Sequence, residues 1–319
     1  MTPLRVIFAG SGEFGLPTLR AVLDAGHQLL QVYTQPDRPA GRGRKLTPTP
    51  IGQFAIDQGL PLIRTQDINR ESLPPADLLV VIAFGQKIAP EVASHARLGS
   101  VNLHSSRLPR WRGAAPINWA ILGGDAQTGN SVIRLADRMD AGAVLAMSQL
   151  SIGELETAGE LHDRLAVDGA SLMLRVMQEL VTGTAVEALQ DESKATRALK
   201  LTREMTKIDW TKSGDEIARH IRGMYPWPGC RVRLVDRHGA EVDRLTLVRA
   251  RAASPMCETA DVAARAAEWG AIGSDLHVCA TAGAIEIIDV QPEGKRPMSL
   301  DAYQNGHRWE VGMRLESIA

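Results

Sequence analysis

Apolar runs alternate with helical patterns along the first 190 residues of the chain. Continuous apolar stretches predict buried strands over 4–10, 29–34, 60–63, 77–84 and 128–135. Between them, the spacing of apolar positions predicts helices after residue 17 and over 51–58, 117–122 and 156–180. Strands that alternate with helices are typical of a mostly parallel sheet. We therefore expect an α/β, Rossmann-like doubly wound N-terminal domain.

The pattern changes after residue 189. A polar connector over 190–206 separates the α/β pattern from a second region. That region opens with a predicted helix over 214–222 and continues as short strands separated by turns, over 230–235, 244–248, 277–280 and 284–290. The spacing of these strands predicts a small β-barrel. The expected organisation is an α/β domain over 1–189, a linker over 190–206 and a smaller domain over 207–319.

One stretch, 99–116, begins as a short predicted strand over 100–104 and then breaks into a loop rich in Pro, Arg and Gly. Side chains of a strand alternate between its faces, so Asn102 and His104 share one face and apolar residues occupy the other. An amide donates without titrating, and an imidazole exchanges a proton near neutral pH. This pair suits acyl transfer, although both side chains could equally serve to hydrogen-bond the following loop.

Composition places the chain among globular proteins of two domains. Its 319 residues contain 44% hydrophobic and 23% charged residues, with a net charge of −1. No apolar run reaches the length of a membrane span, and the N-terminus lacks a basic-then-apolar signal pattern, so a cytoplasmic protein without a membrane partner is expected. The three cysteines have no paired spacing, which argues against a disulfide framework or a zinc site.

Positive charge is concentrated in two places. Ten Lys and Arg residues stand against four acids over 194–233, and four cations lie among Gly and Pro over 37–46. The second stretch is predicted to be an exposed loop. Both clusters would suit contact with a polyanion, and both could instead be solvated surface.

A glycine pattern over 10–15 competes as a functional motif. It matches the G-x-G-x-x-G fingerprint of dinucleotide sites, with a strand before it and a helix after it. Such sites place an acid at the end of the second strand, but here that strand ends at Thr34 and the nearest acid, Asp37, follows a proline. We therefore expect a tight turn that lets the helix pack closely, and no NAD cofactor.

The stretch over 102–116 closely resembles the active-site segment of the folate-dependent formyltransferases. The resemblance extends to Asp140-Ala141-Gly142, to the Ile-Asp-Trp segment at 208–210, to the Pro-Trp-Pro-Gly corner at 226–229 and to 294–298, so it covers nearly the whole chain. Two departures are visible. Arg107 stands where the family usually has the first of two leucines, and the loop over 10–15 carries more glycines than usual.

The resemblance implies specific roles for residues. Asn102, His104 and Asp140 would be catalytic, and a carboxylate beside the imidazole would favour its charged form and fix its orientation. The second domain would be an OB-like barrel. The implied folate-binding residues are Phe84, Gly85, Gln86, Ile88, Ser106, Leu108 and Pro109. The implied tRNA-binding residues are Arg38, Arg42, Arg44, Lys45 and Lys207.

The implied reaction transfers the formyl group of 10-formyltetrahydrofolate to the α-amine of a methionyl ester on initiator tRNA. A monomer that uses no metal is expected. Three alternatives remain at this point. They are formylation of a nucleotide-linked amino sugar by the same residues, a nicotinamide-dependent oxidoreductase built on 10–15, and an RNA-binding module without activity.

Overall fold

A computed structural model describes residues 2–40, 43, 45–253, 269–281 and 283–318 of the chain. Contacts between residues group the chain into two compact units. The first comprises 1–116, 127–150 and 162–198, and the second comprises 117–126, 151–161 and 199–319. The first part of the predicted linker, up to Ala198, therefore belongs to the first unit. Each unit is described by itself below.

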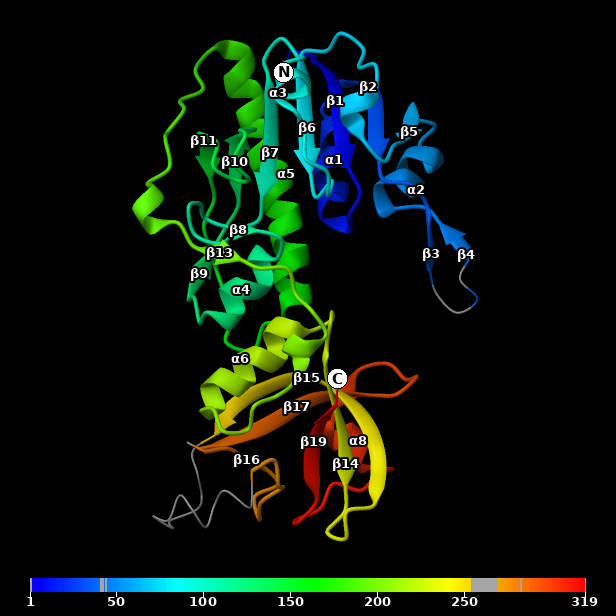
Figure 1. The fold of residues 1–319 in the computed structure, drawn as a ribbon, viewed down its shortest axis with the longest axis vertical. Helices are drawn as coiled ribbons and strands as arrows, with labels where there is room; N and C mark the ends of the chain where they lie inside the picture. Colours follow the sequence, from blue (N-terminus) through cyan, green and yellow to red (C-terminus); the bar gives the residue numbers. More distant parts are fainter. Residues whose placement is uncertain (1, 41–42, 44, 254–268, 282, 319) are drawn as a thin grey trace. The chain divides into compact units, whose positions relative to one another are not determined.

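A seven-stranded sheet forms the centre of the first unit (Figure 1). Its order is β11-β10-β7-β6-β1-β2-β5. The five strands from β7 to β5 run parallel, and β10 and β11 join antiparallel at one edge. The predicted α/β, Rossmann-like fold is confirmed for the parallel part. The strands are β1 (Arg5–Gly10), β2 (Gln28–Thr34), β5 (Leu62–Arg64), β6 (Leu78–Ile82), β7 (Ser100–His104), β10 (Ser131–Arg134) and β11 (Val144–Met147).

Helix α5 covers one face of β7. An added Cβ at Gly169 of α5 would lie only 2.6 Å from Leu103 Cδ2, so the helix packs directly on the apolar face of that strand. The helices of the chain are α1 (Leu16–Asp24), α2 (Pro50–Asp57), α3 (Pro90–Ala93), α4 (Pro116–Leu122), α5 (Ala158–Thr182), α6 (Gly214–Met224) and α8 (Leu300–Gln304). Within the described ranges, no helix is both long and apolar enough to cross a membrane.

The predicted loop over 37–46 contains two short strands. β3 (Arg38–Ala40) and β4 (Lys45–Thr47) pair antiparallel, with Arg38 opposite Thr47. The described side chains of β3 and β4 are exposed, as expected, but part of the predicted loop is a pair of strands. The segment lacks the alternation of apolar and polar residues that signals a half-buried strand, because both arms of this hairpin carry exposed side chains.

The glycine-rich turn after β1 packs closely at both of its ends. At the start of α1, an added Cβ at Gly15 would lie 3.4 Å from Phe8 Cζ, in agreement with the expected close packing of the helix. An added Cβ at Gly10 would lie 2.8 Å from the carbonyl oxygen of Ile82, its partner on β6. The close approach at Gly10 is therefore to the neighbouring strand rather than to α1. The Ser11 hydroxyl accepts a hydrogen bond from the backbone amide of Gln35 (3.1 Å), and this bond connects the turn to the segment after β2.

The second unit is built around an antiparallel sheet of order β16-β17-β15-β14-β19, with β18 paired to β17. Residues 270–272 nearly close this sheet into a barrel, because they bridge β19 on one side and β16 on the other. The predicted small barrel is confirmed. Its strands are β14 (Cys230–Val235), β15 (Glu241–Ala253), β16 (Val278–Cys279), β17 (Ala284–Pro292), β18 (Met298–Ser299) and β19 (Arg314–Ile318). Further short strands of the chain are β8 (Arg112–Gly113), β9 (Gln127–Thr128), β12 (Leu150–Ser151) and β13 (Arg197–Ala198).

Candidate active site

Strand β7 presents Asn102 and His104 on the face opposite α5. The strand lies between β6 and β10, with Asn102 opposite Val81 on one side and His104 opposite Ser131 on the other. His104 is buried, whereas Asn102 is only partly buried. Among the described residues, none hydrogen-bonds the Asn102 side chain. Its amide is therefore available to a ligand.

Both nitrogens of His104 face acceptors of the protein. Nε2 lies 3.0 Å from the carbonyl oxygen of Trp111, and Nδ1 lies 3.6 Å from Oδ1 of Asp140. A carbonyl oxygen only accepts, so Nε2 carries the hydrogen of this bond. The other carboxylate oxygen of Asp140 accepts from the Gly113 amide at 2.9 Å. The structure thus brings Asp140 beside the imidazole, as the resemblance implied.

Two residues that contact His104 have left-handed backbones. Asp140 has a φ of 54° and Trp111 a φ of 61°. Non-glycine residues adopt this conformation rarely, and Asp tolerates it better than Trp does. Such strain persists only where the surrounding structure imposes it, and it is concentrated at functional sites.

The loop after β7 is fastened to the core. The Ser106 hydroxyl donates to the Arg110 carbonyl (2.6 Å), and the Leu108 amide donates to the Ser131 hydroxyl (3.1 Å). Leu108 itself is buried against Ile133 and Val144. Ser106 and Leu108 therefore hold the loop in place, Ser106 by its hydrogen bond within the loop and Leu108 by its contacts with the core.

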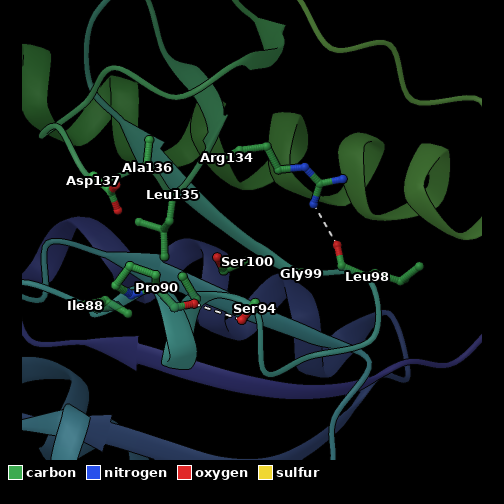
Figure 2. A pocket seen from close by; sticks show the side chains of 11 residues that line it. Ile88, Pro90, Ser94, Leu98, Gly99, Ser100, Arg134, Leu135, Ala136 and Asp137 are labelled. Atoms are coloured by element: carbon green, nitrogen blue, oxygen red, sulfur yellow. Dashed lines mark hydrogen bonds between the residues drawn. The ribbon is translucent and has the colours of Figure 1, made fainter.

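A cavity of about 380 Å³ lies beside the start of β7 and is lined by residues of several segments (Figure 2). Ser100 lines it, and alternation along the strand puts Ser100, Asn102 and His104 on one face. Successive residues on one face of a strand are about 7 Å apart, so Asn102 lies about that distance along β7 from Ser100, which lines the cavity. Its lining is mixed apolar and polar and includes Ile88, Pro90, Leu98, Leu135, Ala136 and Asp137.

The predicted folate residues fall into different places. Ile88 lines the cavity. Phe84 is buried in the hydrophobic core, and its carbonyl accepts from Gln35 Nε2 at 2.9 Å. Gln86 spans two backbone groups, accepting from the Ile68 amide (2.9 Å) and donating to the Thr65 carbonyl (2.8 Å).

Two further predicted folate residues belong to the backbone around these segments. Gly85, with a φ of 75°, forms the turn after β6. The carbonyl of Pro109 accepts from the amide of Thr196 at 3.2 Å, so it belongs to the fastening of the loop. Both positions shape the segments that carry the site.

Two of the predicted tRNA-binding residues, Arg38 and Lys45, do not line this cavity. Arg38 and Lys45 stand on the β3–β4 hairpin, where the Arg38 guanidinium donates to the side-chain oxygen of Gln35. Arg42 and Arg44 lie outside the described residues. Lys207 is exposed in the second unit.

The sequence did not indicate that Arg112, Gln190 and Glu192 form a hydrogen-bonded group next to the site. Arg112 is 8% exposed and pairs with Glu192 (2.8 Å), and its guanidinium also donates to Gln190. Hydrogen bonds from Arg112 and then Arg138 lower the pKa of the Glu192 carboxyl to about 2. No motif marks Gln190 or Glu192, which sit in a polar connector some 80 residues after Arg112.

Comparisons with known proteins identify relatives of both regions. Residues 4–177 match the family model of formyl transferases, and 200–308 match that of the formyl transferase C-terminal domain. A methionyl-tRNA formyltransferase of Methylococcus capsulatus is 40% identical over 95% of this chain and 97% of its own. One of Phenylobacterium zucineum is 38% identical over 98% of this chain and 100% of its own. Among solved structures, an N-formyltransferase of Helicobacter canadensis in complex with folinic acid and dTDP-3-aminofucose has a TM-score of 0.61, at 16% identity, over 88% of this chain and 98% of its own.

Proposed function

The chain belongs to the formyl transferase family, and from that membership we propose that it formylates the α-amine of methionyl-tRNA with 10-formyltetrahydrofolate as the donor. The relatives that carry this activity in their names match nearly the full length of the chain, in both regions. The tRNA in this proposal is the initiator tRNA, and the product is formylmethionyl-tRNA for translation initiation.

One observation carries the proposal at the level of chemistry. A cavity lies beside the start of β7, the strand that carries Asn102 and His104, and the carboxylate of Asp140 lies 3.6 Å from the imidazole. The cavity volume of about 380 Å³ is within the range of small-molecule sites, and the apolar part of its mixed lining suits a flat ring system. The lining residues thus fit the ring of a folate, with the formyl-bearing end directed along β7 towards Asn102.

The nucleophile is the amine of the substrate, so the protein needs to supply none. Bound formyl-folate supplies a formyl group attached to nitrogen. As the amine attacks the formyl carbon, negative charge develops on the formyl oxygen, and the free amide of Asn102 donates a hydrogen bond to it. His104 is the second donor on the same face of the strand.

The reaction requires one proton to move. The attacking amine loses a proton as its bond to the formyl carbon forms, and the folate nitrogen gains one as its bond to that carbon breaks. His104 is placed to relay this proton because an imidazole both accepts and donates near neutral pH. Asp140 orients the ring through Nδ1.

The hairpin of β3 and β4 is proposed as a contact for tRNA. Arg38 and Lys45 stand on its two arms, and cations on an exposed hairpin suit phosphate groups. The second unit offers an antiparallel barrel, an architecture that commonly binds nucleic acid. In this proposal Arg42, Arg44 and Lys207 also bind the tRNA.

A formylation assay tests the proposed function. Purified protein is incubated with 10-formyltetrahydrofolate and either methionyl-initiator tRNA or a nucleotide-linked amino sugar, and the formylated product is identified by mass spectrometry. We expect formyl-methionine only with the charged tRNA. Formylation of the amino sugar instead would show that the chemistry is right and the proposed substrate is wrong. Binding of RNA without any formyl transfer would contradict the proposed enzymatic activity.

A further inference from the structure

A segment of the predicted linker lies along the loop that follows His104. We call residues 190–198 the strap. The Thr196 amide donates to the Pro109 carbonyl (3.2 Å), and its hydroxyl accepts from the Trp111 amide (2.8 Å). Directly after Thr196, β13 of the strap pairs parallel with β8, whose first residue is Arg112. The strap is therefore part of the first unit and borders the site.

Gln190, the first residue of the strap, joins two segments that converge on the site. Its Nε2 donates to the carbonyl oxygens of Asp140 and Gly142, both at 2.8 Å. Its Oε1 accepts from Nε (3.0 Å) and Nη2 (2.7 Å) of Arg112. Both amide hydrogens and the amide oxygen of this partly buried side chain are thereby used.

The two carbonyls that Gln190 holds belong to the turn that carries the catalytic carboxylate. Asp140 sits at a φ of 54°, which an L residue keeps only under constraint. Gly142 is packed so closely that an added Cβ would lie 1.9 Å from the carbonyl oxygen of Arg134. Constraint on both sides of the turn fixes where the Asp140 side chain points.

We propose that Gln190 is a positioning residue, which holds the Asp140 carboxylate against Nδ1 of His104 by bonding the backbone of the Asp140 turn. This inference rests on the proposed function for its kinetic readout only. Misplacement of a group by about 1 Å can cost as much as a hundredfold in rate, so a bond that fixes the turn has a large effect on turnover. Substrate affinity is not expected to depend on it.

The variant Gln190→Glu separates this role from simple pairing with Arg112. A carboxylate has the same shape and accepts from Arg112 at least as well, but it has no hydrogen to donate to the carbonyls of Asp140 and Gly142. Pairing alone would leave Gln190→Glu as active as the parent. A positioning role predicts that its kcat falls by about tenfold or more, while KM for formyl-folate and for methionyl-tRNA changes by less than about twofold.

The neighbouring residue supplies a matched control. Asp191 is exposed and accepts from the Ser193 amide (3.0 Å) at the start of a short helix. The variant Asp191→Asn makes the reverse acid–amide exchange one position along the strap, and its amide oxygen keeps the cap. We expect kcat, KM and melting temperature of Asp191→Asn to match those of the parent.

Two outcomes overturn the inference. The first is a folded Gln190→Glu variant with the kcat of the parent. The second is a crystal structure of Gln190→Glu in which the Asp140 carboxylate keeps its place beside His104, whereas we expect it to have moved.

The crystal structure also separates this inference from the proposed function. If the parent protein fails to formylate methionyl-tRNA, the proposed function fails, and the position of the Asp140 carboxylate in Gln190→Glu still tests the role of Gln190. If Gln190→Glu does not fold, Gln190→Met removes the donated bonds together with those accepted from Arg112, without adding charge. A parental kcat of Gln190→Met contradicts the role, and so does an Asp140 carboxylate that has not moved in its crystal structure.

Discussion

The imidazole of His104 is held between the carbonyl of Trp111, 3.0 Å from Nε2, and the carboxylate of Asp140, 3.6 Å from Nδ1. Because a carbonyl only accepts, the Nε2 hydrogen is committed to the protein's own loop. Trp111 makes this contact from a left-handed backbone with a φ of 61°. Donation from Nε2 to a substrate oxygen therefore requires the bond to Trp111 to be shared or broken.

A complex with substrates tests this consequence. In a crystal structure with a stable formyl-folate analogue and a methionyl-tRNA analogue, we expect Nε2 of His104 to lie more than about 3.5 Å from the Trp111 carbonyl, beyond hydrogen-bond distance. The formyl oxygen should take its place. A bond that stays at its present length, with the formyl oxygen elsewhere, would exclude Nε2 of His104 as the donor.

Replacing Asn102 by alanine tests the oxyanion role. Loss of one oxyanion donor costs about 3 kcal/mol in other enzymes, so Asn102→Ala should lose on the order of a hundredfold in kcat with a similar KM. The fold should remain intact, since the described residues give the Asn102 side chain no hydrogen-bond partner to lose. Kinetics and thermal melting together check this. A parental kcat would assign the role to another group.

The charge of Asp140 can be separated from its backbone role. Asn also tolerates the left-handed conformation and can accept from the Gly113 amide, so Asp140→Asn should fold normally. Without the negative charge beside His104, kcat should fall by at least about a hundredfold. Asp140→Ala should in addition lose about 1–2 kcal/mol of stability, because alanine is strained at this φ. Equal melting temperatures for Asp140→Asn and Asp140→Ala would contradict the expected strain of alanine in the left-handed conformation.

Much of the catalytic strand could be predicted from the sequence alone. The alternation over 100–104 predicted β7 with its observed bounds, and the apolar face it assigned to Leu103 does pack on α5. Alternation is informative here because one face is buried against a helix and the other is not. The closeness of Asp140 to His104 came from the resemblance, since spacing does not fix the path of a turn.

Other features left no signal in the sequence. Gln190 is one polar residue within a polar connector, and its partners Asp140 and Gly142 lie about 50 residues earlier. Periodicity reports which face of an element is buried, but it carries no information about single long-range hydrogen bonds. Phe84 was predicted to line the folate site, and a buried aromatic at the end of a strand looks the same in sequence whether it faces core or cavity.

Charge reversal on the hairpin tests its proposed contact with tRNA. Arg38→Glu and Lys45→Glu, made singly, should each raise KM for methionyl-tRNA by about tenfold and reduce the salt dependence of tRNA binding by about one charge. The KM for formyl-folate should stay unchanged, because both residues lie outside the cavity lining. Arg175→Glu, a similar reversal at an exposed position on α5, serves as the control. An equal rise in KM for methionyl-tRNA in all three variants would mean that the net charge of the protein matters and would contradict a specific contact at the hairpin.

The ion pair between Glu160 and Arg249 predicts how stability depends on pH. The hydrogen bond from Arg249 is the largest cause that lowers the pKa of Glu160 to about 2. An unfolded Glu has a pKa of about 4.3, so the stabilisation is complete above that pH and is lost as pH falls towards 2. Glu160→Gln should therefore have a lower free energy of unfolding than the parent at pH 7 and approach the parent near pH 2. Urea unfolding at several pH values measures the difference, and a difference independent of pH would contradict the assignment.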